Sequence, residues 1–385
     1  MRAKGINYDT GFLSAGTSTH EPFDPERVRA EMRVIRDDLH CTAVRITGGD
    51  PARLEIASNH AADAGLEVWL CPFTNGLTQD ELLALLADCA DRAERLRRGG
   101  AEVVLLTGSE LSLFTVGFLP GDTLAERLAL VGDPLRLRPL IAELRAGINA
   151  FLGRAVAVVR ARFGGRVSYA SILPLEGVDW KPFDVIATDA AYRTSRTAPT
   201  YRESIRAFVE QGRAQGKPVA ITEFGCATFR GAGGVGGTGD ALIEWGDDGR
   251  ASRLKTECAR DEGEQVAYLR ELLDVFDGEG VDAAFLYTFA RYDLLHRDDP
   301  YLDLDRASAG VVKVLDGKSR ALDAADRRYP EMPWEPWRSR RSPSGSCSCR
   351  RRQHPRGGHD AARGRDRGLY LPRAWPCPPP TSGSS

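Results

Sequence analysis

The chain has 385 residues, 42% of them hydrophobic and 28% charged, which excludes a collagen, a coiled coil and a wholly disordered protein. The net charge is −2, but residues 1–337 alone carry −11, and an acidic body argues against nucleic acid as the main partner because phosphates bind basic surfaces. No stretch approaches 18 uncharged apolar residues, so we expect no membrane span.

The first ten residues lack the apolar core of a signal peptide, and a cytoplasmic protein is therefore expected. Eight short runs rich in Val, Ile, Leu or aromatic residues follow along the chain. Several of them lack polar alternation, which is typical of strands buried on both faces of a parallel sheet. The predicted strands are 5–8, 43–46, 67–72, 102–107, 167–172, 184–188, 218–222 and 283–289.

Helical patterns lie between these strands. Asp24-Pro25 opens a helix that runs to Leu39, with proline at its first position. Thr78 and Glu81 form a capping-box sequence before a leucine-rich run. The other predicted helices are 51–64, 139–161, 201–215, 264–276 and 320–327, while the connection 175–183 is too short for a full helix.

Eight strands alternating with helices predict an α/β fold, a (β/α)8 TIM barrel over residues 1–337. A doubly wound sheet is the alternative, but it normally has a GxGxxG turn after its first strand, and this chain has Tyr8-Asp-Thr-Gly11. Long, structureless insertions are expected at 111–137 and 225–258, after strands four and seven, and in a barrel both lie on the active-site face. The glycine run 231–239 lacks the GK[ST] of a nucleotide-binding loop, which favours a mobile lid or simple flexibility.

The last 48 residues differ in composition from the rest. Residues 338–385 contain 11 arginines, no lysine and little aliphatic periodicity, which predicts a disordered tail outside the fold. We expect this tail to be non-functional, and an RNA-binding basic tail is the alternative. The eight cysteines include no CxxC pair, so free and mostly buried thiols are expected.

Two glutamates follow strands of the predicted barrel. Strand four ends in Leu105-Leu-Thr-Gly-Ser-Glu110, and strand seven ends in Ile221-Thr-Glu-Phe-Gly225. Glycoside hydrolysis needs two carboxyl groups beside the scissile bond, one to protonate the leaving oxygen and one to stabilise or attack the anomeric carbon. Glu110 and Glu223 therefore form a candidate catalytic pair, whereas the alternative is that each is an ordinary surface acid.

This arrangement resembles clan A of the glycoside hydrolases, the 4/7 superfamily, over about residues 3–330. Ile-Thr-Glu-Phe-Gly is similar to the strand-seven nucleophile motif of that clan. The resemblance implies a retaining enzyme with Glu223 as nucleophile, Glu110 as general acid/base, a carbohydrate substrate, and no metal or organic cofactor. That clan usually has Asn before the acid/base, where this chain has Ser109. The runs 4–9 and 222–232 are also similar to actinobacterial proteins labelled "abortive infection protein".

Other residues at strand ends are candidates for binding the substrate or orienting the acids. By the same resemblance, Arg45 would hydrogen-bond the nucleophile, and a tyrosine near position 192 would contact it. Tyr287 or Phe289 would replace the clan's tryptophan as a sugar platform, although core packing of either ring is the alternative. The full set of candidates is Asn7, Arg45, Ser109, Asp189, Tyr192, Tyr287 and Arg291.

The remaining motifs argue against other chemistries. The six histidines show no HExxH or paired metal spacing, and no GxSxG elbow is present. The acids 298, 299, 303 and 305 lack EF-hand spacing. The leading hypothesis is thus a retaining O-glycoside hydrolase or transglycosylase. The alternative is a catalytically inactive barrel that binds a carbohydrate, nucleotide or protein partner, because Ser109 replaces the clan's Asn.

Overall fold

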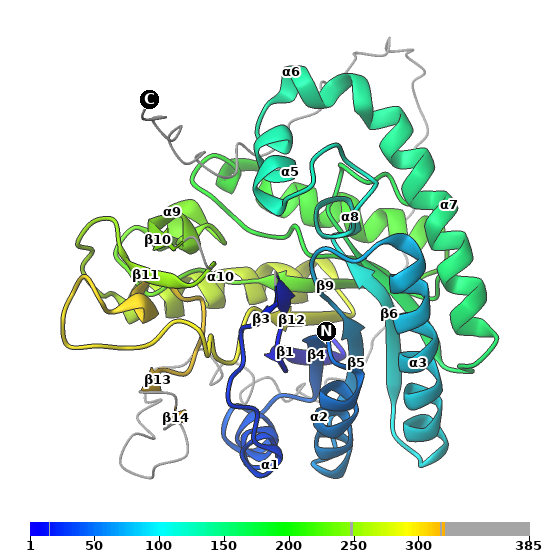
Figure 1. The fold of residues 1–385 in the computed structure, drawn as a ribbon, viewed down its shortest axis with the longest axis horizontal. Helices are drawn as coiled ribbons and strands as arrows, with labels where there is room; N and C mark the ends of the chain where they lie inside the picture. The colour runs from blue at the N-terminus through cyan, green and yellow to red at the C-terminus, as the bar shows by residue number, and fades with distance from the viewer. Residues whose placement is uncertain (15, 247–248, 316–317, 320–385) are drawn as a thin grey trace, which may run out of the picture.

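The protein folds as a closed barrel of eight parallel strands surrounded by helices, as the sequence predicted (Figure 1). The computed structural model describes residues 1–14, 16–246, 249–315 and 318–319. Each barrel strand pairs with its neighbours in chain order, and the first strand pairs with both the second and the last, which closes the barrel. The barrel strands are β1 (Ala3–Asp9), β4 (Ala43–Gly48), β5 (Glu67–Pro72), β6 (Val103–Ser109), β7 (Arg166–Ser171), β8 (Ile186–Thr188), β9 (Val219–Phe224) and β12 (Ala283–Leu286).

Helices cover the outside of this barrel, and their starts follow the predicted signals. Asp24 caps α1 with Pro25 at its first position, and Thr78 and Glu81 form the predicted capping box of α3. The first helix is shorter than expected, because Val34–Asp38 continues it as a π-helical turn. The α-helices are α1 (Pro25–Arg33), α2 (Pro51–Asp63), α3 (Gln79–Arg98), α4 (Leu111–Phe114), α5 (Leu124–Val131), α6 (Pro134–Leu137), α7 (Ile141–Arg160), α8 (Tyr201–Ala214), α9 (Ala232–Val235) and α10 (Glu262–Glu279).

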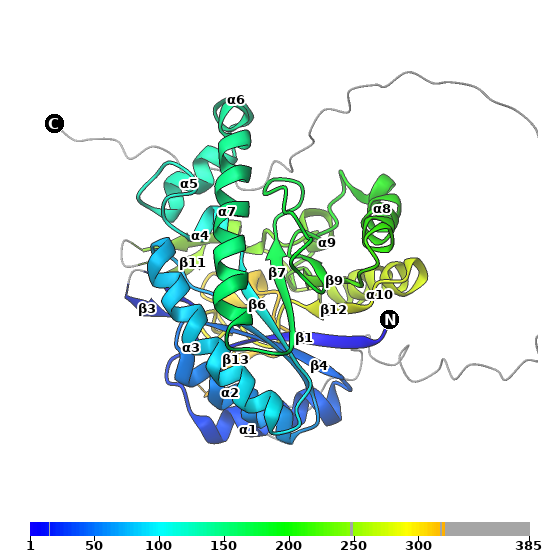
Figure 2. The same ribbon diagram turned by 90° about the vertical axis from the view of Figure 1, so that its right-hand side faces the viewer.

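The insertions after β6 and β9 are folded, which corrects the expectation of structureless loops. Residues 111–137 form α4, α5 and α6, and in Figure 2 strands β6 and β7 rise toward this group of helices. Residues 225–258 contain α9 and the hairpin of β10 (Ile243–Trp245) and β11 (Ala251–Leu254). The connection 175–183 holds no helix, as predicted. The remaining short strands are β2 (Leu13–Ser14), β3 (Thr17–Ser18), β13 (Val314–Leu315) and β14 (Lys318–Ser319).

Apolar side chains fill the molecule in two layers. The larger layer lies between the strands and the helices, and it includes Tyr8, Phe151 and Phe276. The smaller layer fills the barrel itself, where the ring centroids of Trp69 and Phe285 lie 4.8 Å apart among small alanines. The barrel is therefore a packed frame rather than a pore, and chemistry is confined to its ends.

Two sequence predictions lie outside the described residues. These are the helix 320–327 and the tail 338–385 with its boundary at residue 337. Within the part of the chain that the structure describes, no helix has both the length and the apolar character needed to cross a bilayer.

Candidate active site

Glu223 lies at the carboxyl end of β9, and two donors hold its carboxylate. Arg45 Nη1 donates to Oε1 at 2.8 Å, and the Tyr192 hydroxyl donates to Oε2 at 2.9 Å. The side chain is only 12% exposed. Each carboxylate oxygen therefore has one donor, which fixes the orientation of the group and favours its ionised form.

Arg45 is the centre of the buried part of this site. It points into the barrel from β4 and is fully buried. Besides Glu223, its Nη1 donates to Asn7 Oδ1 at 3.0 Å, and its Nη2 donates to Asp189 Oδ2 at 3.2 Å and to Cys71 Sγ at 3.4 Å. The planar guanidinium group thus contacts four side chains from different strands and loops, which a flexible ammonium group cannot do in one plane.

Hydrogen bonds to other protein groups hold three further buried residues of the site, Asn7, Ser109 and Asp189. The Asn7 amide donates to the Thr222 carbonyl at 2.9 Å, which ties the end of β1 to β9. The Ser109 hydroxyl donates to the carboxylate oxygen of Asp189 that also accepts from Arg45. Asp189 and Ser109 are buried, at 0% and 1% exposure. Their contacts in the structure are with other protein groups, so the substrate-binding role predicted for them stays a prediction.

Glu110 follows β6 directly, at the same end of the barrel as Glu223. Its backbone takes the left-handed conformation with φ of 48°, and its amide donates to the Ala170 carbonyl at 3.0 Å. Positive φ is uncommon outside glycine and marks a turn that the surrounding structure imposes. Among the described residues, the Glu110 side chain has no hydrogen-bond donor, in contrast to Glu223.

The electrostatics separate the two glutamates. Burial and the charges of Asp189 and Glu223 hold the pKa of Glu110 well above its usual value. Burial and Asp189 also raise the pKa of Glu223, to about 7, but Arg45 and the Tyr192 hydroxyl act in the opposite direction. The Glu223 carboxylate has the guanidinium of Arg45 as a direct partner, whereas Glu110 has no such partner among the described residues, so the ionised form is favoured at Glu223 over Glu110. Glu223 ionises first and Glu110 keeps the proton.

Tyr287 and Arg291 follow β12. Burial raises the pKa of the Tyr287 hydroxyl, and the charge of Glu223 acts in the same direction. Arg291 is held by Asp240 at 3.1 Å and by Asp293 at 2.8 Å, and it makes no hydrogen bond to either glutamate in the described residues. Phe289 is fully buried, with its ring against Tyr8, and so packs in the core.

The sequence did not reveal several partners of these residues. Asp240 belongs to the insertion after β9, and Cys71 belongs to β5. Glu176, in the connection after β7, accepts from the Ser112 amide two residues beyond Glu110. Each is a single residue without a surrounding motif. The short connection 175–183 is the one signal that pointed to an unusual segment.

A second group of possible metal ligands contains none of the residues of this site. His296, Asp303 and Asp305 bring their ligand atoms within 4.8 Å of one another. Arg260 pairs with Asp305 at 2.8 Å and with Asp303 at 3.0 Å, and Arg306 donates to Asp303 at 2.7 Å. Two guanidinium groups already neutralise these acids, so the group is an ion-pair network that joins Arg260, just before α10, to residues 296–306.

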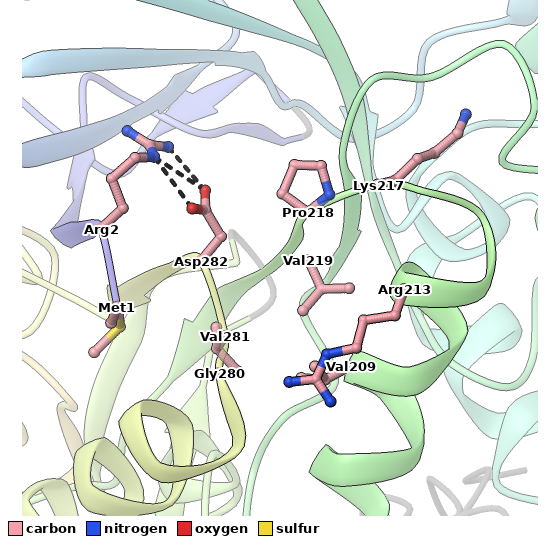
Figure 3. A pocket seen from close by; sticks show the side chains of 10 residues that line it. All are labelled: Met1, Arg2, Val209, Arg213, Lys217, Pro218, Val219, Gly280, Val281 and Asp282. Carbon is pink, nitrogen blue, oxygen red and sulfur yellow. Dashed lines mark hydrogen bonds and ion pairs between the residues drawn. The ribbon is translucent and has the colours of Figure 1, made fainter. Parts of the chain in front are cut away.

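A cavity of about 360 Å³ opens at the opposite end of the barrel (Figure 3). Arg2, Val219 and Asp282 line it from the amino ends of the strands, and Arg2 pairs with Asp282 at 2.9 Å. In barrel enzymes the chemistry lies at the carboxyl ends of the strands. The cavity is therefore separate from the site of Glu110 and Glu223.

Comparison with solved structures supports the fold. A complex of GH113 beta-1,4-mannanase superposes with a TM-score of 0.53 at 17% identity, covering 81% of this chain and 95% of that one. The GH113 beta-mannanase AaManA from Alicyclobacillus acidocaldarius, in complex with ManMIm, gives a TM-score of 0.53 at 16% identity over 80% and 92% of the two chains. No family model and no curated protein matches the chain. At this identity the likeness shows a shared (β/α)8 barrel.

Proposed function

We propose that this chain is a retaining O-glycoside hydrolase or transglycosylase, with Glu223 as the nucleophile and Glu110 as the general acid/base. The observation that supports the proposal is the unequal environment of the two glutamates. Arg45 and Tyr192 donate to Glu223, whereas Glu110 has no such donor among the described residues and keeps its proton. A retaining site needs one ionised and one protonated carboxyl group beside the same acetal.

The proposed reaction has two steps. Glu110 protonates the leaving oxygen while a Glu223 oxygen attacks the anomeric carbon, which breaks the glycosidic bond and forms a glycosyl ester. The ester carries no charge, so the pKa of Glu110 falls once Glu223 is esterified. Glu110 then accepts a proton from water, whose oxygen attacks the anomeric carbon; this breaks the bond to Glu223, restores its carboxylate and releases the sugar with retained configuration. A sugar hydroxyl in place of water gives transglycosylation.

The substrate class is proposed by analogy with the similar solved structures. The similar solved structures are described as beta-1,4-mannanases, so we propose a β-glycoside and place β-1,4-manno-oligosaccharides first among test substrates. The cytoplasmic location and the resemblance to proteins labelled "abortive infection protein" stay predictions from the sequence.

The test follows product stereochemistry and chemical rescue. Purified protein is assayed on manno-oligosaccharides and aryl β-glycosides, and the first-formed anomer is read by NMR. We expect the β-anomer first. Glu110→Ala should lose about 10²- to 10⁴-fold in kcat on glycosides with poor leaving groups, the usual contribution of general acid catalysis. Azide should restore turnover of activated glycosides by this variant and yield the β-glycosyl azide.

Glu223→Ala is the matched variant, because it removes the other carboxyl group from the same end of the barrel. With azide it should form the α-glycosyl azide, since azide then attacks the face that the nucleophile occupied. An α-anomer as the first product of the wild type contradicts the proposal. A Glu223→Gln variant that hydrolyses the same substrates as fast as the wild type also contradicts the proposal.

A further inference from the structure

Glu110 occupies the N-cap of helix α4, and its own side chain makes no capping hydrogen bond. The first amides of any helix lack partners within the helix, and the N-cap side chain normally satisfies one of them. Here the amides of Leu111 and Ser112 are buried beside the active site. Other groups must therefore accept from them if the Glu110 carboxyl group is to face the substrate.

Two side chains from the neighbouring strand and its loop provide these acceptors. The Tyr169 hydroxyl, on β7, accepts from the Leu111 amide at 2.9 Å. Glu176 Oε1 accepts from the Ser112 amide at 3.0 Å. Both side chains have 0% exposure. Side chains outside α4 thus accept from its first amides, so the Glu110 side chain is not needed for capping.

Further donors fix Glu176 itself. Its Oε2 accepts from the Tyr169 hydroxyl at 2.8 Å, the Ser171 hydroxyl at 3.0 Å and the Ile172 amide at 3.0 Å. With the Ser112 amide this makes four donors to one carboxylate. A buried carboxylate with four donors is locked in place, and the Tyr169 proton is committed to it, so the same hydroxyl presents its lone pair to Leu111.

We infer that Glu176, acting with Tyr169, is a positioning residue for the general acid: it holds the turn that carries Glu110 and leaves the Glu110 carboxyl group free for proton transfer. This inference rests on the proposed function. It concerns how the acid step is supported, and the identity of the nucleophile does not depend on it.

Glu176 also acts on Glu110 through its charge. Burial and the charges of Asp189, Glu223 and Glu176 raise the pKa of Glu110, while the charge of Arg45 lowers it. Neutralising Glu176 therefore lowers the pKa of Glu110. The acid must be protonated for the first step, so the basic limb of the kcat/KM profile should move to lower pH.

The test compares Glu176→Gln with wild type on aryl β-glycosides of graded leaving-group ability. An amide has one acceptor oxygen and cannot serve four donors. We expect kcat/KM on a phenyl glycoside to fall at least about tenfold, with less than about threefold change in kcat/KM on a dinitrophenyl glycoside, whose leaving group needs no protonation. The basic limb should also shift downward.

Glu31→Gln is the matched control. Glu31 is fully buried on α1 and accepts from the Tyr292 hydroxyl at 2.8 Å, but its helix packs outside the barrel. It should lower stability without changing either the leaving-group dependence or the basic limb. The inference would be overturned if Glu176→Gln lowered kcat/KM by the same factor on both glycosides and left the basic limb of the pH profile at its wild-type position.

Tyr169→Phe keeps the inference testable if Glu176→Gln fails to fold. It removes the acceptor of the Leu111 amide and one donor to Glu176 while keeping the buried ring. We expect the same selective loss on the phenyl glycoside, and a uniform or absent effect would overturn the inference. Failure of the proposed function itself is seen separately, as a wild-type protein that forms no glycosyl ester at Glu223.

Discussion

Glu110 and Glu223 show how the surroundings of a side chain assign it a role. Both are glutamates at the carboxyl ends of barrel strands, and burial raises the pKa of each. What separates them is the pair of donors on Glu223, one from Arg45 and one from Tyr192. The charge that Glu223 carries in turn keeps the proton on Glu110.

Tyr192→Phe should move the acidic limb of the kcat/KM profile to higher pH. The hydroxyl donates to Glu223 and lowers its pKa, so its loss disfavours the ionised nucleophile. A hydrogen bond to a charged group contributes about 1.5 kcal/mol, which corresponds to a displacement of about one pH unit. The measurement is the pH dependence of kcat/KM on an aryl glycoside.

Tyr292→Phe provides the control for this variant. It removes a tyrosine donor from the buried Glu31 at 2.8 Å, outside the barrel. It should lower the stability of the protein and leave the acidic limb of the kcat/KM profile at the wild-type pH. An unmoved limb in Tyr192→Phe would mean that this hydroxyl does not help to ionise Glu223.

The sequence suggested contacts for residues that lie in a recognisable motif and gave no signal for isolated residues. Arg45 was expected to hydrogen-bond Glu223, and it does so at 2.8 Å. Glu176 was not singled out, because a lone glutamate in a loop has no spacing that marks it. The partner of Arg291 was equally hidden, since Asp240 is 51 residues away in the chain.

The insertion after β9 is the element that bears most directly on the site. Its glycine run packs on the ring of Tyr192, and a Cβ built on Gly237 would lie 2.7–2.9 Å from three ring atoms. Contacts under 3.0 Å force one of the partners to move. The run therefore has a packing role against the side chain that holds Glu223, in addition to any flexibility.

Gly237→Ala should displace the Tyr192 ring and weaken its hydrogen bond to Glu223. We expect the acidic limb to move in the same direction as in Tyr192→Phe, and the double variant to add little to either single one. Gly153→Ala is the control, because nothing lies within 4 Å of its Cβ position in α7, and alanine there should stabilise the helix by about 1 kcal/mol. A wild-type profile for Gly237→Ala would show that this contact does not position Tyr192.

The barrel elements were predictable because their signals are local. Buried strands appear as short apolar runs, and helix starts appear as capping residues such as Thr78. The folded insertions could not be predicted from the sequence, because α5 and the β10–β11 hairpin depend on packing against distant segments. Arg127 of α5 donates to Asn75 Oδ1 at 3.0 Å, and the Leu254 amide of β11 donates to the Tyr301 carbonyl at 2.8 Å, and no short window of sequence contains these contacts.

For the whole molecule, barrel closure is what brings the site together. The first strand pairs with both the second and the last, so Asn7, Arg45 and Glu223 meet although 178 residues separate the last two. The number and order of strands in the sequence were sufficient to predict this meeting. Strand order was not sufficient to predict how deeply each side chain is buried, because the burial of Ser109 and Asp189 follows from how the strands twist around the inner core.

Covalent trapping tests most directly whether Glu223 is the nucleophile. The protein is incubated with a 2-deoxy-2-fluoro β-glycoside bearing a dinitrophenyl leaving group, and intact protein and peptic peptides are weighed by mass spectrometry. We expect one added fluoroglycosyl group, on the peptide that contains Glu223. A wild-type protein that hydrolyses the parent glycoside but takes up no label, or takes it up on another residue, contradicts the account.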